Sequence, residues 1–166
     1  MHERLAFIKE KYFDCENLTC VVATQDGDVY PSRQRGALPL LRLVNSNLDF
    51  TGGFAADKVV GRGAAVLYVL LHVSELWANV ISEPALDLLQ QYGIACEYGT
   101  LAAAIINRTG DGCCPMEEAV RGIDDMDEAL IALKKRQREL LGDNAQLADG
   151  LAPEPLYTEW TKRSAC

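Results

Sequence analysis

Cys114 is the residue of this sequence with the clearest chemical potential. It follows the glycine-bearing turn in TGDGCCPMEEA, residues 109–119, and precedes Pro115, which suits the first position of a helix. A helix N-terminus stabilises the thiolate form of a cysteine. Such a thiol can serve as a nucleophile or as a redox-sensitive group, whereas the usual fate of a cytosolic thiol is to be buried and inert. The sequence leaves both interpretations open.

The residues around Cys114 suggest an anion site. Arg108 lies a few positions upstream and suits a contact with an anionic ligand, and Asn107 precedes the same turn. Glu117 falls in the first helical turn, where a carboxylate complements the helix dipole and opposes a thiolate unless it points away. We therefore expect Asn107, Arg108 and Glu117 to line a ligand site. A strained disulfide between Cys113 and Cys114 is the least favoured alternative.

Asp57 and Lys58 form a second candidate group. The apolar spacing that follows them predicts a buried helix from Asp57 to about Val73, so the two residues would lie at its start. In a pocket, Lys58 could hold a carboxylate or phosphate, or act with Asp57 as an acid–base pair. The alternative is structural, with Asp57 capping the helix and Lys58 pointing to solvent.

Three further polar residues could face the same pocket. Arg62 lies between two glycines and could reach an anion or extend along the surface into solvent. Ser82 and Glu83 end an apolar strand, and ligands of α/β sheets gather beyond the carboxyl ends of strands. Glu83 could pair with Lys58 there, or Ser82 and Glu83 could only cap the helix that follows.

The elements that must position these residues follow from hydrophobic spacing and turn residues. A hairpin followed by alternating helices and strands predicts a mixed sheet covered on both faces, an α/β fold forming a three-layer α/β/α sandwich. In chain order we expect a helix over 3–13, strands LTCVVAT and VYPS around an Asp26-Gly27 turn, a helix over 36–46 with Pro39 in its first turn, the helix from Asp57, a strand WANVI, a helix from Ser82 to Gly93, a strand IACEYG, an extended LAAAIINR, a short helix CPMEEAVRG and a long helix DDMDEALIALKKRQRELL.

This order of elements resembles the cytidine deaminase-like fold. In that family an H-x-E motif at the start of the buried helix supplies one zinc ligand and the catalytic glutamate, and two cysteines open the next helix as P-C-x-x-C. Here VISEPALDLL keeps Glu83-Pro84 but has Ala85 and Leu88 at the cysteine positions, and Asp57-Lys58-Val59 opens the predicted buried helix. The resemblance thus implies the fold and the pocket but not deamination by zinc-activated water.

A closer resemblance covers about residues 17–140. The stretches ADKVVGRGAA, VISEPAL and IINRTGDGCCPME look like a small family of prokaryotic proteins that is known as a domain of unknown function. That family is assigned to the deaminase-like fold and lacks the zinc motif. The resemblance implies a fold and a pocket and brings no established reaction.

Composition narrows the class of protein. The chain has 166 residues, 49% of them apolar, which predicts one domain over residues 1–142 and a tail over 143–166. Its net charge of −8 argues against binding a nucleic acid polymer. With a charged N-terminus and no apolar run of membrane-spanning length, we expect a cytoplasmic protein that has reduced thiols and binds no membrane.

Metal binding is not expected. The six cysteines show no C-x-x-C spacing and there are only two histidines, so zinc would need ligands gathered from far apart. The acidic residues around 117–128 complement helix dipoles, and weak binding of a divalent cation is the alternative.

Two functional hypotheses follow. We expect a cofactor-free domain that binds a small ligand, nucleotide-like or anionic, in a regulatory or sensing role. The alternative is a metal-independent enzyme that uses Cys114 with Lys58, Asp57 and Glu83. The sequence does not decide whether the protein is an enzyme or a homo-oligomer.

Overall fold

The computed structural model describes residues 3–14 and 17–142, so the predicted tail at 143–166 lies outside the described residues. The elements run in the order α1 (Glu3–Ile8), η1 (a π-helix, Lys9–Asp14), β1 (Cys20–Ala23), β2 (Val29–Ser32), α2 (Leu38–Val44), β3 (Phe54–Val60), α3 (Arg62–Leu70), β4 (Glu75–Ser82), α4 (Glu83–Gln91), β5 (Ala95–Ala102), α5 (Pro115–Ala119) and α6 (Met126–Leu141).

The strands form one five-stranded mixed sheet in the order β2-β1-β3-β4-β5. β1 is antiparallel to both β2 and β3, while β3, β4 and β5 are parallel to one another. The predicted α/β fold with a mixed sheet is confirmed. Because β3, β4 and β5 are parallel, their carboxyl ends meet at one edge of the sheet, where α3 and α4 begin.

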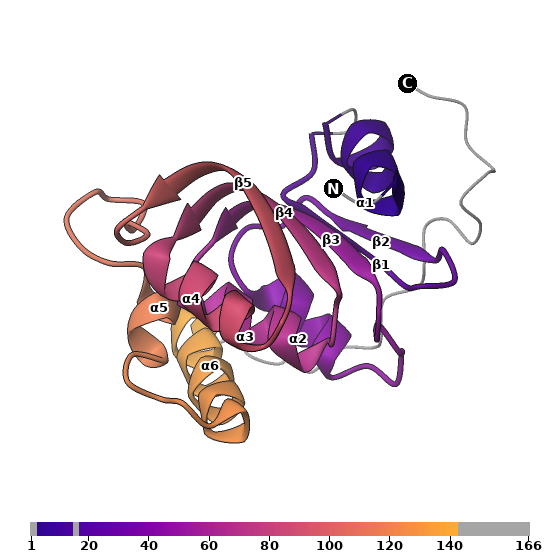
Figure 1. Cartoon of the computed structure of the whole chain (residues 1–166). Coiled ribbons are helices and arrows are strands. Elements are labelled where there is room, and N and C mark those ends of the chain that lie inside the picture. The colour runs from indigo at the N-terminus through magenta and orange to yellow at the C-terminus, as the bar shows by residue number, and fades with distance from the viewer. Residues whose placement is uncertain (1–2, 15–16, 143–166) are drawn as a thin grey trace.

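Helices lie on both faces of the sheet. In Figure 1, α2 to α6 lie below the sheet, and the main core cluster joins their apolar residues to those of β1, β3 and β4. α1 lies on the opposite face, where Leu5, Ile8 and Phe13 pack against β1, β2 and β3.

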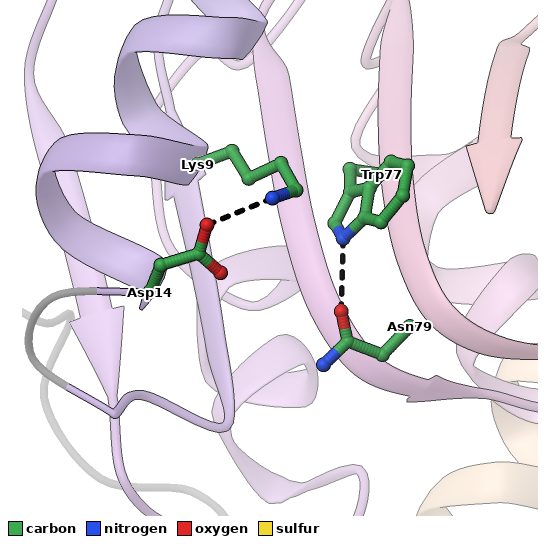
Figure 2. A network of polar contacts seen from close by, with 4 residues as sticks. All are labelled: Lys9, Asp14, Trp77 and Asn79. Atoms are coloured by element: carbon green, nitrogen blue, oxygen red, sulfur yellow. Dashed lines mark hydrogen bonds and ion pairs between the residues drawn. The ribbon is translucent and has the colours of Figure 1, made fainter. Parts of the chain in front are cut away.

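A polar network connects the N-terminal helices α1 and η1 to β4. Lys9 of η1 lies 4.7 Å from the centre of the Trp77 ring and forms an ion pair with Asp14 at 2.7 Å. Trp77 in turn donates from its indole nitrogen to Asn79 Oδ1 at 2.9 Å (Figure 2). A cation over an indole ring is attracted to its π face. The network therefore adds a charged contact to the apolar packing of α1.

The prediction of a helix from Asp57 to Val73 is wrong in its first part. Residues 54–60, FAADKVV, form the central strand β3, and the helix starts only at Arg62, after Gly61 as its N-cap. A central strand covered on both faces reads as an almost continuous apolar run, which periodicity alone does not distinguish from a buried helix. Asp57 and Lys58 therefore lie within a strand and not at a helix start.

The other local predictions agree with the structure. The hairpin turns at Asp26-Gly27, and Pro39 lies in the first turn of α2. Ser82 is the N-cap of α4 and accepts from the backbone N–H of Ala85, and Gly93 has a positive φ of 73° just beyond that helix. The predicted strand over 77–81 extends to Glu75–Ser82. Within residues 3–14 and 17–142, no helix is both long and apolar enough to cross a membrane.

Candidate functional site

The carboxyl edge of the parallel strands is the region where polar groups from distant segments meet. β3 ends at Val60 and β4 at Ser82, and each passes directly into a helix of nine residues. A helix N-terminus presents backbone N–H groups that have no partner within the helix and attract an acceptor or an anion. Two such helix starts therefore lie at the same edge.

The carboxylate of Glu117 occupies this edge. Its Oε1 accepts the backbone N–H of Arg62 at 3.2 Å and the hydroxyl of Ser82. Its Oε2 accepts the backbone N–H of Ile105 at 2.8 Å. Glu117 is 6% exposed and Ser82 is fully buried. One carboxylate thus joins the start of α3, the end of β4 and the segment after β5, and we call this arrangement the Glu117 junction.

α5 is held in place by close packing against α3. Met116 and Val120 of this helix are buried in the main core. A Cβ atom added to Gly63 would come within 2.9 Å of the backbone oxygen of Met116 and 3.1 Å of Leu133 Cδ2. The glycine at this position therefore allows close helix packing.

Arg62 secures the end of α5 from the other side. Its guanidinium donates to the backbone oxygens of Val120 at 3.3 Å and Ile123 at 3.0 Å. It also lies 3.5 Å from the carboxylate of Asp124, which is 95% exposed, so this ion pair contributes little. The donors of Arg62 are thus directed at protein oxygens, and its predicted role as a ligand contact stays a prediction.

Ser82, which ends β4, and Glu83, which begins α4, differ in exposure. Ser82 caps α4 and also takes part in the Glu117 junction, so capping is not its only contact. Glu83 is exposed in the first turn of α4. Lys58, its predicted partner, donates instead to Asn17 Oδ1 at 2.6 Å. The structure therefore brings Ser82 to the junction and leaves Glu83 at the surface.

Asp57 is buried between β3 and α3. Its Oδ2 accepts the hydroxyl of Tyr68 at 2.7 Å, and its Oδ1 accepts the backbone N–H of Val59 at 3.0 Å. Burial raises the pKa of Asp57 to about 6, although the hydrogen bonds from Tyr68 and the backbone act in the opposite direction. Asp57 is therefore a carboxyl group that titrates inside the core.

Cys20 adds a thiol to this buried group. It lies opposite Asp57 in the β1–β3 pairing, and burial together with the charge of Asp57 raises the pKa of its thiol. Burial and Asp57 likewise raise the pKa of Tyr68. We call Cys20, Asp57 and Tyr68 the Asp57 cluster. A thiol and a phenol that resist ionisation in this way are poor nucleophiles.

Cys114 is the N-cap residue of α5, as the sequence predicted. Its backbone N–H donates to Ile105 O at 2.8 Å, and its side chain is partly buried against the main core. In the described part of the chain, no hydrogen bond or ion pair joins its sulfur to another residue. The guanidinium of Arg121 approaches Cys113 instead, at 3.6 Å. Both cysteines are free thiols, so the structure contains no vicinal disulfide.

The turn before Cys113 is organised by its own polar side chains. Asn107 Nδ2 donates to Asp111 Oδ1 at 2.9 Å, and Thr109 donates to both residues. These bonds from Thr109 and Asn107 lower the pKa of Asp111. Arg108 is exposed at the tip of the turn. The side chain of Asn107 thus has a structural task, and the predicted ligand contacts of Asn107 and Arg108 stay predictions.

Metal-binding residues do not gather in the part of the chain that the structure describes. No group of three or more His, Cys, Asp or Glu side chains in residues 3–14 and 17–142 is placed to hold an ion. Cavities lie beside the described helices. One, of about 270 Å³, lies near the end of α3 and includes His72 and Tyr92 in its wall; another, of about 320 Å³, lies between α5 and α6 and includes Glu118 and Lys135.

Sequence reasoning missed the central part of the Glu117 junction. Glu117 was expected to line a ligand site, but nothing in its spacing indicates that it meets the start of α3 and the end of β4, 35 residues or more away. The hydrogen bond from Tyr68 to Asp57 was also not predicted, because Tyr68 looked like one more apolar position in a buried helix. The signal in the sequence was a glutamate flanked by the apolar residues Met116 and Val120, which are both buried, because a carboxylate at such a position needs donors in the interior.

The family of the chain is settled by a match over most of its length. Residues 8–136 match the model of the family described as TM1506, a domain of unknown function (DUF1893). The chain belongs to the DUF1893 family. This confirms the predicted membership of a family without an assigned function, over nearly the range that the resemblance suggested.

A solved structure of a DUF1893 protein supports the fold. The crystal structure of TM1506 from Thermotoga maritima is similar to the chain with a TM-score of 0.73 and 27% sequence identity, over 81% of this chain and 92% of that one. No curated protein matches the chain. The DUF1893 comparison therefore establishes the family and the arrangement of helices around the sheet.

Proposed function

We propose that this DUF1893 domain binds a small anionic or nucleotide-like ligand in a regulatory or sensing role, without zinc, at the carboxyl edge of β3, β4 and β5. The proposal includes a cytidine deaminase-like, three-layer arrangement. It is supported by a hairpin at one side of the sheet, three parallel strands at the other, and a helix directly after β3 and after β4. Ligands of such sheets gather beyond the carboxyl ends of the strands.

The residues at the zinc position of a deaminase do not fit the metal. With the helix start corrected, α3 opens with Gly61, Arg62 and Gly63, in place of a motif with histidine and glutamate. Ala85 and Leu88 of α4 are buried and carry no donor atom in their side chains. Hydrolysis by zinc-activated water is therefore not part of the proposal.

The observation that carries the proposal is the Glu117 carboxylate at the Glu117 junction. The N–H of Arg62, the hydroxyl of Ser82 and the N–H of Ile105 form a receptor for an anionic group, and the protein fills it with its own carboxylate. A carboxylate or phosphate of a ligand would be received by the same donors once α5, a helix of five residues, moves away. Glu117 would then act as a competitor that sets the affinity.

The alternative, an enzyme that uses Cys114, has less support. Its predicted charged partners are engaged elsewhere, since Asp57 bonds to Tyr68 and Lys58 bonds to Asn17. A nucleophilic thiol needs an adjacent base or a cation that stabilises its thiolate. The guanidinium of Arg121 lies beside Cys113, the neighbouring cysteine.

A ligand screen with matched variants tests the binding proposal. Thermal unfolding of the full chain is followed with inorganic phosphate, nucleoside monophosphates and nucleoside triphosphates, for the wild type, Glu117→Gln and Glu118→Gln. We expect at least one anion to raise the melting temperature of the wild type and to bind Glu117→Gln with a different affinity, because the competing charge is gone. Glu118 is exposed next to Glu117, so Glu118→Gln should bind as the wild type does. If none of these anions changes the melting temperature of the wild type, the proposal is contradicted.

The alternative has its own test. The alkylation rate of Cys114 is measured against pH by mass spectrometry of its peptide, with Cys113 as the internal comparison. A reactive site requires Cys114 to react faster than Cys113 at neutral pH and to approach its limiting rate at lower pH. Equal, ordinary rates for both thiols would rule out the enzyme hypothesis.

A further inference from the structure

The two edges of the sheet are unlike each other. The β2 edge is four residues long and contains Pro31, which lacks an N–H and so cannot complete a ladder of hydrogen bonds. The β5 edge is eight residues long, ACEYGTLA, with no proline and no lysine. Natural proteins protect exposed sheet edges with short strands, proline, or charged residues such as lysine. β2 has such protection, whereas β5 carries one charged residue, Glu97.

β5 is exposed along nearly its whole length. It pairs with β4 on one side, and no other described strand pairs with its outer side. Most of its residues are exposed, including the large side chains of Tyr98 at 39% and Leu101 at 42%. A long, uncovered strand with open N–H and C=O groups is a template for another strand. In Figure 1 it forms the front edge of the sheet, away from α1.

We propose that two copies of this chain pair antiparallel through β5, giving a dimer with one continuous ten-stranded sheet. This inference does not depend on the ligand proposal. A second copy is favoured over a repeating chain of molecules because a twofold contact between like surfaces closes on itself. A contact between β5 of one copy and β2 of the next would add copies indefinitely and form an open polymer. Pro31 and the short length of β2 disfavour this pairing.

Symmetry restricts the register of the pairing. A twofold axis perpendicular to the sheet leaves each side chain on the same face of the sheet in both copies. Two residues that lie opposite each other therefore have the same residue number or residue numbers that differ by an even number. A register centred on Glu97 would place two carboxylates directly opposite each other, which is unfavourable. Centred on Tyr98, it places Tyr98 opposite its own copy, Glu97 opposite Gly99, and Cys96 opposite Thr100. Cross-strand aromatic pairs are favourable, so we assign this register.

Charge substitution at the symmetric position tests both the dimer and its register. Sedimentation velocity of the full chain should give a mass twice the 18.2 kDa of one chain. Tyr98→Glu and Tyr98→Lys should each weaken the dimer by about a hundredfold, because like charges meet on the axis. A mixture of the two variants should restore a heterodimer, because opposite charges then meet there.

Tyr92→Glu is the matched control. Tyr92 is 45% exposed, similar to Tyr98, but it is the C-cap residue of α4 and does not belong to β5. This variant should dimerise as the wild type does. A wild type that is monomeric at all concentrations overturns the proposal and leaves the edge to another occupant, such as an extended peptide of a partner. A dimer that tolerates Tyr98→Glu, or a mixture that stays monomeric, overturns it as well.

Hydrogen exchange of the wild type covers the case in which a Tyr98 variant does not fold. The N–H groups of β5 that point away from β4 should exchange slowly at high protein concentration and faster on dilution. Protection in β5 that does not change with concentration, while the mass falls to that of one chain, would contradict the proposal.

Discussion

Asp57 and Glu117 are both buried carboxylates, and they are held in different ways. Asp57 is 8% exposed and Glu117 is 6% exposed. The partners of Asp57 come from its own strand and from α3, the helix that directly follows. The partners of Glu117 come from α3, the end of β4 and the segment after β5. The comparison teaches that the location of its donors decides whether a buried carboxylate stays within one strand–helix unit or joins segments that are distant in the sequence.

The largest expected effect is that of Glu117→Ala. The variant leaves two N–H groups and one hydroxyl in the interior without an acceptor, at about 1–3 kcal/mol each. We expect the free energy of unfolding to fall by about 3–5 kcal/mol in urea denaturation. Glu118→Ala, one residue along on the exposed side, should stay within about 0.5 kcal/mol of the wild type. Equal losses for the two variants would show that the junction does not hold the fold together.

The next effect is the pH response of Asp57. Its pKa of about 6 in the folded protein exceeds the ordinary 3.8, so the folded state binds the proton more tightly than the unfolded state. The stabilisation from this proton is fully present below pH 4 and is lost as the pH rises through about 6. A shift of about two pKa units corresponds to about 3 kcal/mol.

Asp57→Asn isolates this response. The free energy of unfolding of the wild type, measured relative to Asp57→Asn, should decrease between about pH 4 and pH 6 and level off above that range. Parallel pH profiles for the two proteins would mean that Asp57 does not titrate in the core.

Ser82→Ala is expected to cost about 1–2 kcal/mol, since it removes a hydrogen bond to Glu117 and the cap of α4. A double-mutant cycle with Glu117→Ala separates the two contributions. The double variant should lose less than the sum of the single losses, because both changes remove the same bond. Strict additivity would indicate that Ser82 acts only as a cap.

The smallest expected effect is that of Tyr68→Phe. Removing one hydrogen bond costs about 1 kcal/mol. Since that bond lowers the pKa of Asp57, its loss should move the pKa of this carboxyl further above 6. A carbon-detected NMR titration of the Asp57 carboxyl group measures this shift. A lower pKa in the variant would contradict the role assigned to Tyr68.

Local signals in the sequence predicted most elements of the fold. The Asp26-Gly27 turn, Ser82 and Pro84 at the start of α4, and the acidic residues at the start of α6 act over a few residues, so their effect can be inferred from neighbouring residues in the sequence. The error at β3 has a physical cause: a strand covered on both faces shows no alternation. Asp57 in its middle looked like a helix cap because its true partner, Tyr68, lies eleven residues further on.

The candidate site was predictable only in part. The predicted local positions of Ser82 at a helix start and of Glu117 in a first helical turn agree with the structure, because caps and first-turn acids follow local rules. Their meeting depends on the parallel order of β3 and β4 and on the docking of α5, which the one-dimensional pattern does not contain.

The Glu117 junction also bears on how the chain is completed during synthesis. All five strands lie within residues 20–102, so they leave the ribosome before α5 does. Until residue 117 emerges and α5 docks, the N–H of Arg62 and the hydroxyl of Ser82 lack their acceptor. A nascent chain that ends after β5 therefore has the whole sheet and still contains unmet polar groups in its interior. We expect such a chain to stay open and available to chaperones, so that docking of α5 is the step that commits the domain to its native state.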